Sequence, residues 1–373
     1  MNTLYNLAVL ILFSFFFAGD QALELRHSSP LPVCEQTAKR EKVAVFNLAF
    51  KSADGGQTWQ DISDGLPTPV QDDNDVTRDI YFADANGLYL TAGNGIYHCK
   101  ANAKVPVWSK DVFPHKYSSI APGKAGIFAF NYWGGILQNT NGTDVWSPVF
   151  TDLKDERVRS IFETVGGTVF IGSDRGLFKS TNNGKTWKHV YAGGWAIKMV
   201  ANDRILLATS MKGIIRSTDD GENWTLVISE GGVGIDVSAI NGGFAAITFN
   251  TQSNTRRIRT SYDGGKSWQP IDAGLQSKYV NDSRWQLVTA GVPAQSITDS
   301  AWNPGNNSLP VQAFITTIIE VGGNFFCGHP NGIYKSSDKG ETWKLVFPSV
   351  KGKVFNLCVS GNLIYAIPVN GGC

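Results

Sequence analysis

The chain carries almost no excess of either charge. Its 373 residues include 33 Lys and Arg against 32 Asp and Glu, so the formal net charge is +1. The basic residues form no stripe along the sequence, whereas nucleic-acid binding needs concentrated positive charge. We therefore expect no nucleic acid among the partners.

Segments with helical periodicity are nearly absent as well. Short β-branched and aromatic runs alternate instead with Gly, Asn and Asp, in a chain of 40 glycines, 11 tryptophans and 21 phenylalanines. Runs of this kind, bounded by turn residues, predict an all-β protein.

Long apolar runs are scarce too, and the exception is at residues 4–18. It is short for a membrane span and typical of a signal-peptide core, although no Lys or Arg precedes it. We expect residues 1–22 to be a signal peptide, with an uncleaved anchor as the alternative. No membrane insertion is expected after cleavage. The signal peptide therefore predicts a secreted or periplasmic protein.

Familiar catalytic motifs are missing. The sequence contains no His-Glu-x-x-His, no Gly-x-Ser-x-Gly and no phosphate-binding loop. We expect no metal and no cofactor, and a non-enzymatic protein is favoured over an enzyme. The oligomeric state is left open.

What the chain does contain is five copies of one pattern, Ser-x-Asp-x-Gly-x-Thr-Trp, with Asn182, Asn223 and Ser267 as departures from it. Degenerate copies at residues 101–108 and 139–146 keep the Trp, which suggests that packing is indispensable. An Asp side chain can accept backbone N–H groups across a turn, Gly permits positive φ, and Trp can bury its ring. The paired positions are Asp54 and Trp59, Asn182 and Trp187, Asp219 and Trp224, Asp263 and Trp268, and Asp338 and Trp343.

The pattern resembles the Asp-box, or BNR repeat. The resemblance implies a tight turn between the third and fourth strands of each β-propeller blade. Metal binding or catalysis by the repeated Asp residues is the alternative, and we favour the structural role because Asp and Gly in turns need no further explanation.

Spacing between the copies predicts six whole blades, starting near residues 78, 117, 157, 195, 234 and 312. The last of these is expected to have strands at residues 312–323, 324–328, 332–336 and 342–346. Residues 353–360 and 363–369 supply two strands of a seventh blade, which residues 43–52 and 58–62 complete. We therefore predict an all-β, seven-bladed β-propeller of four-stranded antiparallel blades, closed by N- and C-terminal strands that share one blade.

The propeller is expected to span residues 43–373 as one domain, after an N-terminal extension at residues 23–42. Because Cys34 and Cys373 flank the shared blade, we hypothesise a disulfide between them. The other cysteines, Cys99, Cys327 and Cys358, lie in predicted strands and are expected to be buried.

Propeller geometry places the repeated turns on one face and the connections between second and third strands, and between blades, on the other. Function usually lies among the latter loops. A long insertion at residues 272–311 is expected to form a wall or lid there, or a cap on its own blade. Candidate catalytic carboxylates are Asp72, Asp75, Asp152, Asp155, Asp174 and Asp299. Candidate ligand-binding residues are Trp133, Arg175, Arg256, Arg257, Arg284, Trp285, Trp302 and His329.

Among related families, the single propeller is most similar to the photosystem II stability and assembly factors, which bind other proteins. Sialidases, xyloglucanases and sortilins are more distant. The arginine element that precedes the first repeat of sialidases is absent, and xyloglucanases need two propellers. The sequence thus favours an exported protein- or carbohydrate-binding scaffold, with a glycoside hydrolase that uses paired carboxylates as the alternative.

Overall fold

The computed structural model describes residues 48–67, 80–92, 95–103, 105–114, 117, 119–140, 145–149, 153, 156–229, 232–275 and 315–369. All of them belong to the second of two compact units, Met1–Val43 and Ala44–Cys373. The description below concerns this second unit alone.

The unit consists of seven antiparallel four-stranded sheets, which we number as blades I to VII. Blade I contains β3 (Tyr81–Asp84), β4 (Gly87–Ala92), β5 (Gly95–Lys100) and β6 (Trp108–Val112). Blade II contains β7 (Ser119–Gly123), β8 (Gly126–Phe130), β9 (Ile136–Asn139) and β10 (Trp146–Pro148). Blade III contains β11 (Val158–Glu163), β12 (Val169–Ser173), β13 (Gly176–Ser180) and β14 (Lys188–Tyr191).

The next three blades repeat this order. Blade IV contains β15 (Met199–Asn202), β16 (Ile205–Ser210), β17 (Gly213–Ser217) and β18 (Thr225–Ile228). Blade V contains β19 (Gly232–Ile240), β20 (Gly243–Asn250), β21 (Thr255–Ser261) and β22 (Gln269–Pro270). Blade VI contains β23 (Ile318–Val321), β24 (Asn324–His329), β25 (Gly332–Ser336) and β26 (Lys344–Pro348).

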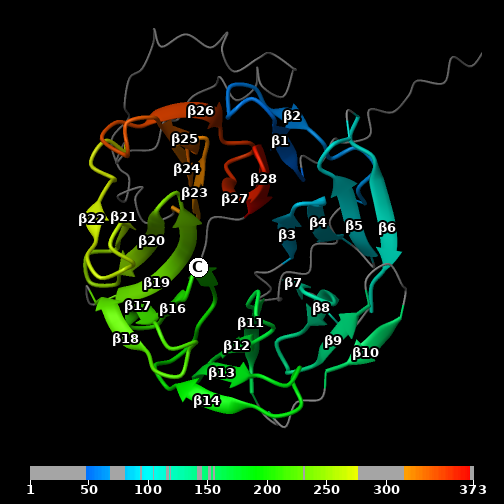
Figure 1. Ribbon diagram of the computed structural model, residues 1–373. Helices are drawn as coiled ribbons and strands as arrows, with labels where there is room; N and C mark the ends of the chain where they lie inside the picture. Colours follow the sequence, from blue (N-terminus) through cyan, green and yellow to red (C-terminus); the bar gives the residue numbers. More distant parts are fainter. Residues whose placement is uncertain are drawn as a thin grey trace, which may run out of the picture. The chain divides into compact units, whose positions relative to one another are not determined.

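Blade VII is assembled from both ends of the described chain, as predicted. Its strands are β27 (Val354–Ser360), β28 (Leu363–Val369), β1 (Phe50–Ser52) and β2 (Gln60–Asp61). β1 pairs with β28 in the register Phe50 to Ala366, and Figure 1 shows the blue and red strands side by side. The predicted seven-bladed propeller with a shared closing blade is therefore confirmed.

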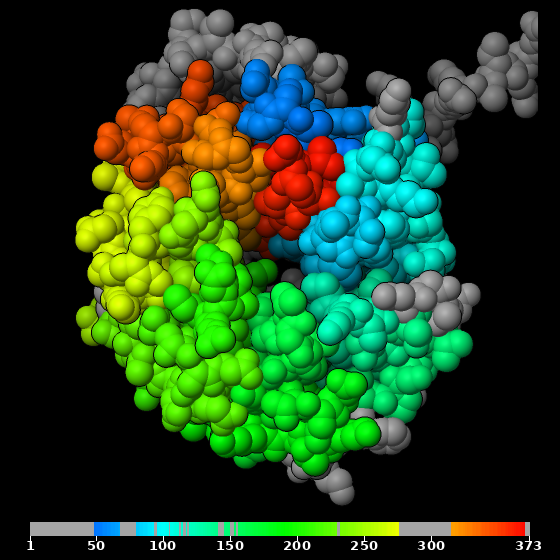
Figure 2. All heavy atoms as spheres, in the orientation of Figure 1, coloured from blue at the N-terminus to red at the C-terminus, as the bar shows by residue number. Residues whose placement is uncertain are grey.

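The first strands that Figure 1 labels, β3, β7, β11, β19, β23 and β27, lie towards the centre. Contacts join β27 to β3, β3 to β7, β7 to β11, β15 to β19, β19 to β23 and β23 to β27. The space-filling view shows the blades surrounding a hollow at the centre (Figure 2). Because the ring closes on itself, no blade leaves a whole sheet face open to water.

Seven apolar clusters lie at the seven seams between neighbouring blades. Each cluster includes the Trp that ends one repeat, and the degenerate copies contribute Trp108 and Trp146 in the same way. Trp343, for example, is 9% exposed and packs between blades V and VI. The expectation that the Trp of the repeat serves packing is thus met at every seam.

The five complete repeats form one kind of turn. In each, the Ser hydroxyl donates to the Asp or Asn side chain at 2.7 to 2.9 Å, and the Gly N–H donates to the Ser hydroxyl at 2.7 to 2.9 Å. The Gly has positive φ in all five, between 78° and 92°. β26 begins at Lys344 rather than at the expected Thr342, because the Thr342 N–H donates to Asp338 within the turn at 2.9 Å.

A further feature of the repeat is a basic residue just before the Ser in four blades. Its side chain reaches the corresponding turn of the next blade. Lys51, Arg216 and Lys335 donate to the carbonyls of Ala101, Gly264 and Gly55, at 3.0, 2.6 and 3.0 Å. These bonds tie third strands to turns across the seams, and the last one links blade VI to the closing blade.

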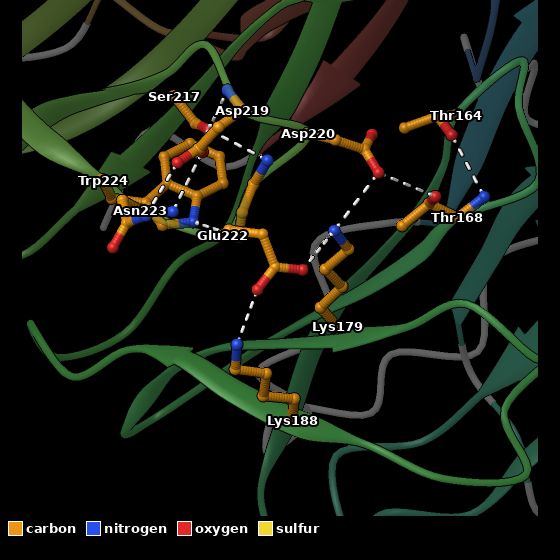
Figure 3. A network of polar contacts seen from close by, with 11 residues as sticks. Thr164, Thr168, Lys179, Lys188, Ser217, Asp219, Asp220, Glu222, Asn223 and Trp224 are labelled. Atoms are coloured by element: carbon orange, nitrogen blue, oxygen red, sulfur yellow. Dashed lines mark hydrogen bonds and ion pairs between the residues drawn. The ribbon is translucent and has the colours of Figure 1, made fainter.

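Lys179 makes the fourth such link (Figure 3). Its ammonium is 2.8 Å from Glu222 Oε1 and 3.2 Å from Asp220 Oδ2, although the side chain is only 5% exposed. Lys188 binds the other oxygen of Glu222 at 2.6 Å. Burial lowers the pKa of Lys179, but hydrogen bonds to Glu222 and Asp220 outweigh it and leave the pKa raised. The cation therefore stays charged at the seam between blades III and IV.

Candidate functional site

Antiparallel pairing gives the propeller two different faces. The repeated turns and the connections between first and second strands form one, which we call the turn face. The connections between second and third strands and between successive blades form the other, which we call the loop face. Since the repeated turns are alike in blades III to VII, differences between these blades are concentrated on the loop face.

One group of aromatic and charged side chains stands out on the loop face of blades II, III and IV. We call it the Trp133 cluster. It consists of Tyr132, Trp133, Glu156, Arg157, Arg159, Asp174, Arg175 and Trp195, which come from four separate connections and the start of β11.

The loop after β8 presents the cluster's most exposed ring. Asn131 Oδ1 accepts the N–H groups of Trp133 and Gly135 at 3.1 and 3.0 Å, which closes a tight turn. Gly134 has φ of 91°, and a Cβ there would lie 3.1 Å from the Glu156 carbonyl. The turn thereby lies against the segment that enters blade III, and it leaves Trp133 70% exposed.

Two arginines approach the aromatic rings from the start of blade III. Arg157 precedes β11, and Arg159 lies at the register shift near the start of that strand. The Arg157 guanidinium lies 3.9 Å from the Trp133 ring centroid. Arg159 lies 5.4 Å from the ring centroid of Tyr132 and 5.5 Å from that of Trp195. These separations are those of cation–π contacts.

Asp174 joins the two blades at the base of the cluster. Its carboxylate accepts a hydrogen bond from Arg159 Nε and another from the Tyr132 hydroxyl, the latter at 2.7 Å. The bond to Asp174, with burial, raises the pKa of Tyr132, so the phenol stays protonated as a donor. Asp174 therefore orients both an arginine and a tyrosine.

Glu156 and Arg175 form a second ion pair beside the first. The Glu156 side chain is 2% exposed and that of Arg175 is 68% exposed. The carboxylate is thus covered while much of the guanidinium still faces solvent. Within the described part of the chain, Arg157 is the cluster's arginine that pairs with no carboxylate.

Three other predicted ligand residues lie elsewhere in the structure. Arg256 is buried and donates to the Ile315 carbonyl at 2.5 Å, and His329 is fully buried and accepts the Asn331 N–H at 3.1 Å. Arg257 pairs with the buried Asp272 at 2.8 Å. These side chains contribute to the seams and strand ends of blades V and VI, and they do not join the Trp133 cluster.

The remaining predicted residues lie outside the described part of the chain. They are Asp72, Asp75, Asp152, Asp155, Asp299, Arg284, Trp285, Trp302, Cys34 and Cys373. Of the insertion predicted at residues 272–311, only residues 272–275 are described, and the proposed disulfide is therefore untested. Cys99 and Cys327 are buried in strands as expected, and Cys358 is partly buried; all three are free thiols.

The Asp residues of the repeats are occupied within their own turns. Asp263 accepts from the Ser267 N–H and hydroxyl, and the hydroxyl contributes most to its lowered pKa. The Thr342 hydroxyl likewise lowers the pKa of Asp338 to about 2. Across the described ranges, no group of three or more His, Cys, Asp or Glu side chains is arranged to hold a metal ion. Those ranges also contain no helix long and apolar enough to cross a membrane.

Sequence reasoning identified Trp133, Asp174 and Arg175 but missed Tyr132, Glu156, Arg159 and Trp195. One signal for Trp195 was available. Seven tryptophans end repeats, and among the described ones only Trp133 and Trp195 do not. Tyr132 and Arg159 gave no comparable signal, because they meet only when two blades pack together.

Comparisons with known proteins support the fold. The sequence matches no family profile and no curated relative. Among solved structures, it is similar to a GH74 xyloglucanase from Xanthomonas campestris, with a TM-score of 0.54 and 16% identity, covering 83% of this chain and 52% of that one. The chain thus spans about half the length of that enzyme.

Two further similar structures have lower scores. One is the extracellular domain of a putative hybrid two-component system from B. thetaiotaomicron, with a TM-score of 0.49 and 15% identity, covering 78% of this chain and 36% of that one. The other is YCF48 bound to D1 peptide, with a TM-score of 0.34 and 14% identity, covering 65% and 90%. At these identities the likeness concerns the fold alone.

Proposed function

We propose that the chain is an exported Asp-box β-propeller that acts as a protein-binding scaffold, and that the Trp133 cluster is its binding site. The observation that carries the proposal is the 70% exposure of Trp133 on a loop that Asn131 and Gly134 hold in place. A large exposed ring held on a rigid loop is costly to leave in water, and it is typical of an interaction site.

The composition of the cluster favours a protein over a carbohydrate ligand. Trp, Tyr and Arg are the residues most enriched at energetic hot spots of protein interfaces. Here Trp133, Tyr132 and Arg157 lie within 6 Å of one another by ring and guanidinium separations. Arg157 lies over one face of the Trp133 ring, which leaves less of that ring for stacking against a sugar.

The hydrolase alternative receives less support. Glycoside cleavage needs two carboxyl groups roughly 5 to 10 Å apart, one of them able to act as an acid. Each described carboxylate of the Trp133 cluster has another role: Asp174 binds Arg159 and Tyr132, and Glu156 is covered and bound to Arg175. Asp272 similarly holds Arg257 and the Ile258 N–H.

Capture with matched variants tests the proposal. The immobilised wild type, Trp133→Ala and Tyr262→Ala are exposed to extracytoplasmic protein from the source, and retained proteins are identified by mass spectrometry. Tyr262 is a suitable control because it is 54% exposed and follows β21 on the turn face. We expect a partner held by the wild type and Tyr262→Ala but lost from Trp133→Ala. Equal retention by all three would contradict the proposal.

A parallel assay addresses the hydrolase alternative. The wild type and Asp174→Asn are incubated with a panel of oligosaccharides that includes xyloglucan and sialylated glycans. The scaffold proposal predicts intact glycans with both proteins. If the wild type gives new cleavage products and Asp174→Asn does not, the scaffold proposal is wrong and the hydrolase alternative is supported.

A further inference from the structure

The charges of the Trp133 cluster do not balance among its described members. It contains three arginines and two carboxylates. Asp174 pairs with Arg159, and Glu156 pairs with Arg175, which leaves the Arg157 guanidinium with aromatic contacts alone. A partly exposed guanidinium without a carboxylate partner retains donors for an added anion.

The same contacts hold Arg157 in a defined position. Its guanidinium stacks at 3.9 Å from the Trp133 centroid and lies 5.6 Å from that of Tyr132. Cation–π contacts do not use the guanidinium N–H groups as hydrogen-bond donors to a carboxylate, so these groups can make two parallel bonds to one. Because the side chain is already ordered, binding costs less conformational entropy than it would for a free arginine.

Neighbouring side chains favour an anionic partner as well. The exposed Lys212 and Lys198 lie in the adjacent connections of blade IV, and Arg175 remains largely exposed despite its ion pair. Met211 is 48% exposed beside Lys212. The loop face of blades III and IV therefore carries further exposed basic groups, which favour an acidic segment over a neutral one.

From this arrangement, and resting on the proposed protein-binding function, we infer that the partner contributes an acidic segment. A carboxylate of that segment binds the edge of the Arg157 guanidinium, and an adjacent apolar side chain packs on Trp133.

Fluorescence polarisation with two synthetic peptides tests the inference. One is a fluorescein-labelled peptide that alternates Asp or Glu with Phe, and the other carries Asn and Gln in place of the acids. Wild type is expected to bind the acidic peptide at least about tenfold more tightly than its amide counterpart, as a charge-assisted bidentate contact requires. Arg157→Gln should remove that preference, and Arg157→Lys should restore only part of it because a lysine cannot stack or bond in the same way.

Arg204→Gln is the matched control, since Arg204 is an exposed arginine in the connection between β15 and β16 on the turn face. It should leave both affinities unchanged. Equal affinity for the two peptides, no binding of the acidic peptide, or an acid preference that survives Arg157→Gln would each overturn the inference. If a protein partner is still lost from Trp133→Ala in that case, the proposed function stands and only the partner's chemistry is wrong.

Discussion

The described tryptophans fall into two sets that differ in position and in surroundings. Seven of them end repeats and fill the seams between blades, where their surroundings are apolar in every copy. Trp133 and Trp195 do not belong to a repeat, and both contact arginines on the loop face. A Trp in the repeat therefore stabilises the packing between blades, whereas Trp133 and Trp195, outside the repeat, belong to a local cluster on the loop face.

Carboxylates show the same division. The Asp at the third position of the repeat is satisfied within eight residues of sequence, as Asp219 is by Ser217 and Asn223. Asp174 instead receives groups from blades II and III that lie far apart in the chain. Repetition therefore marks the groups that build the scaffold, and departures from it locate the candidate site.

The largest expected contrast is between two Trp→Ala substitutions. Trp343→Ala should lower the free energy of unfolding by about 3 to 5 kcal/mol, because it empties a seam where the indole also donates to the Ile271 carbonyl at 2.8 Å. Trp133→Ala should change it by less than about 0.5 kcal/mol. Denaturant unfolding of both variants measures the contrast, and equal losses would remove the distinction between the two sets.

Asp236 sharpens the comparison of carboxylates, because it is buried in β19 rather than exposed in a turn. Burial raises its pKa to about 6, against the opposing effects of Lys198 and of the Ile318 N–H, which donates to it at 3.1 Å. Since the native state holds the proton more tightly than the unfolded state does, this group's contribution to stability grows as the pH falls through about 6 towards 4.

Replacing Asp236 with Asn should remove that dependence. Relative to Asp236→Asn, the wild type should gain about 2 to 2.5 kcal/mol of unfolding free energy between pH 7 and pH 4, at about 1.4 kcal/mol per pKa unit. Denaturant titrations at several pH values provide the measurement, with Asp203→Asn as an exposed control. A constant difference between wild type and Asp236→Asn would show that the buried carboxyl does not titrate in this range.

A smaller loss of unfolding free energy is expected when the basic residue that links two neighbouring blades is replaced. Lys179→Met should cost about 1 to 3 kcal/mol, because it leaves Asp220 and Glu222 without their buried cation. Lys188→Met removes an exposed partner of the same Glu222 and should cost less than about 1 kcal/mol. Thermal unfolding at low and high salt compares them, and a larger loss from Lys188→Met would contradict this view of the seam.

The fold was largely predictable from sequence because each blade repeats the same local turn. The spacing of the repeats gave six whole blades, and the strand-like runs at residues 353–360, 363–369 and 43–62 gave the seventh, which the structure closes in that way. The loop-face site was only partly predictable. Tyr132, Arg159 and Asp174 are brought together by packing between blades, which no local pattern encodes.

The burial of two predicted ligand residues has a related cause. Arg256 and His329 lie at the loop-face ends of β21 and β24, but both side chains are buried. A sequence position near a strand end does not reveal whether its side chain points to solvent or into the neighbouring seam. The basic residues before the repeated Ser were visible in the sequence, but their role appeared only once the next blade was in place.

Hydrogen–deuterium exchange of the protein with a captured partner tests the central claim most directly. We predict that the partner slows exchange of the amides at residues 131–135 and 156–159 on the loop face, and leaves the turn at residues 217–224 unchanged. Slower exchange confined to the repeated turns, with none at the Trp133 cluster, would contradict the assignment of function to the non-repeated residues.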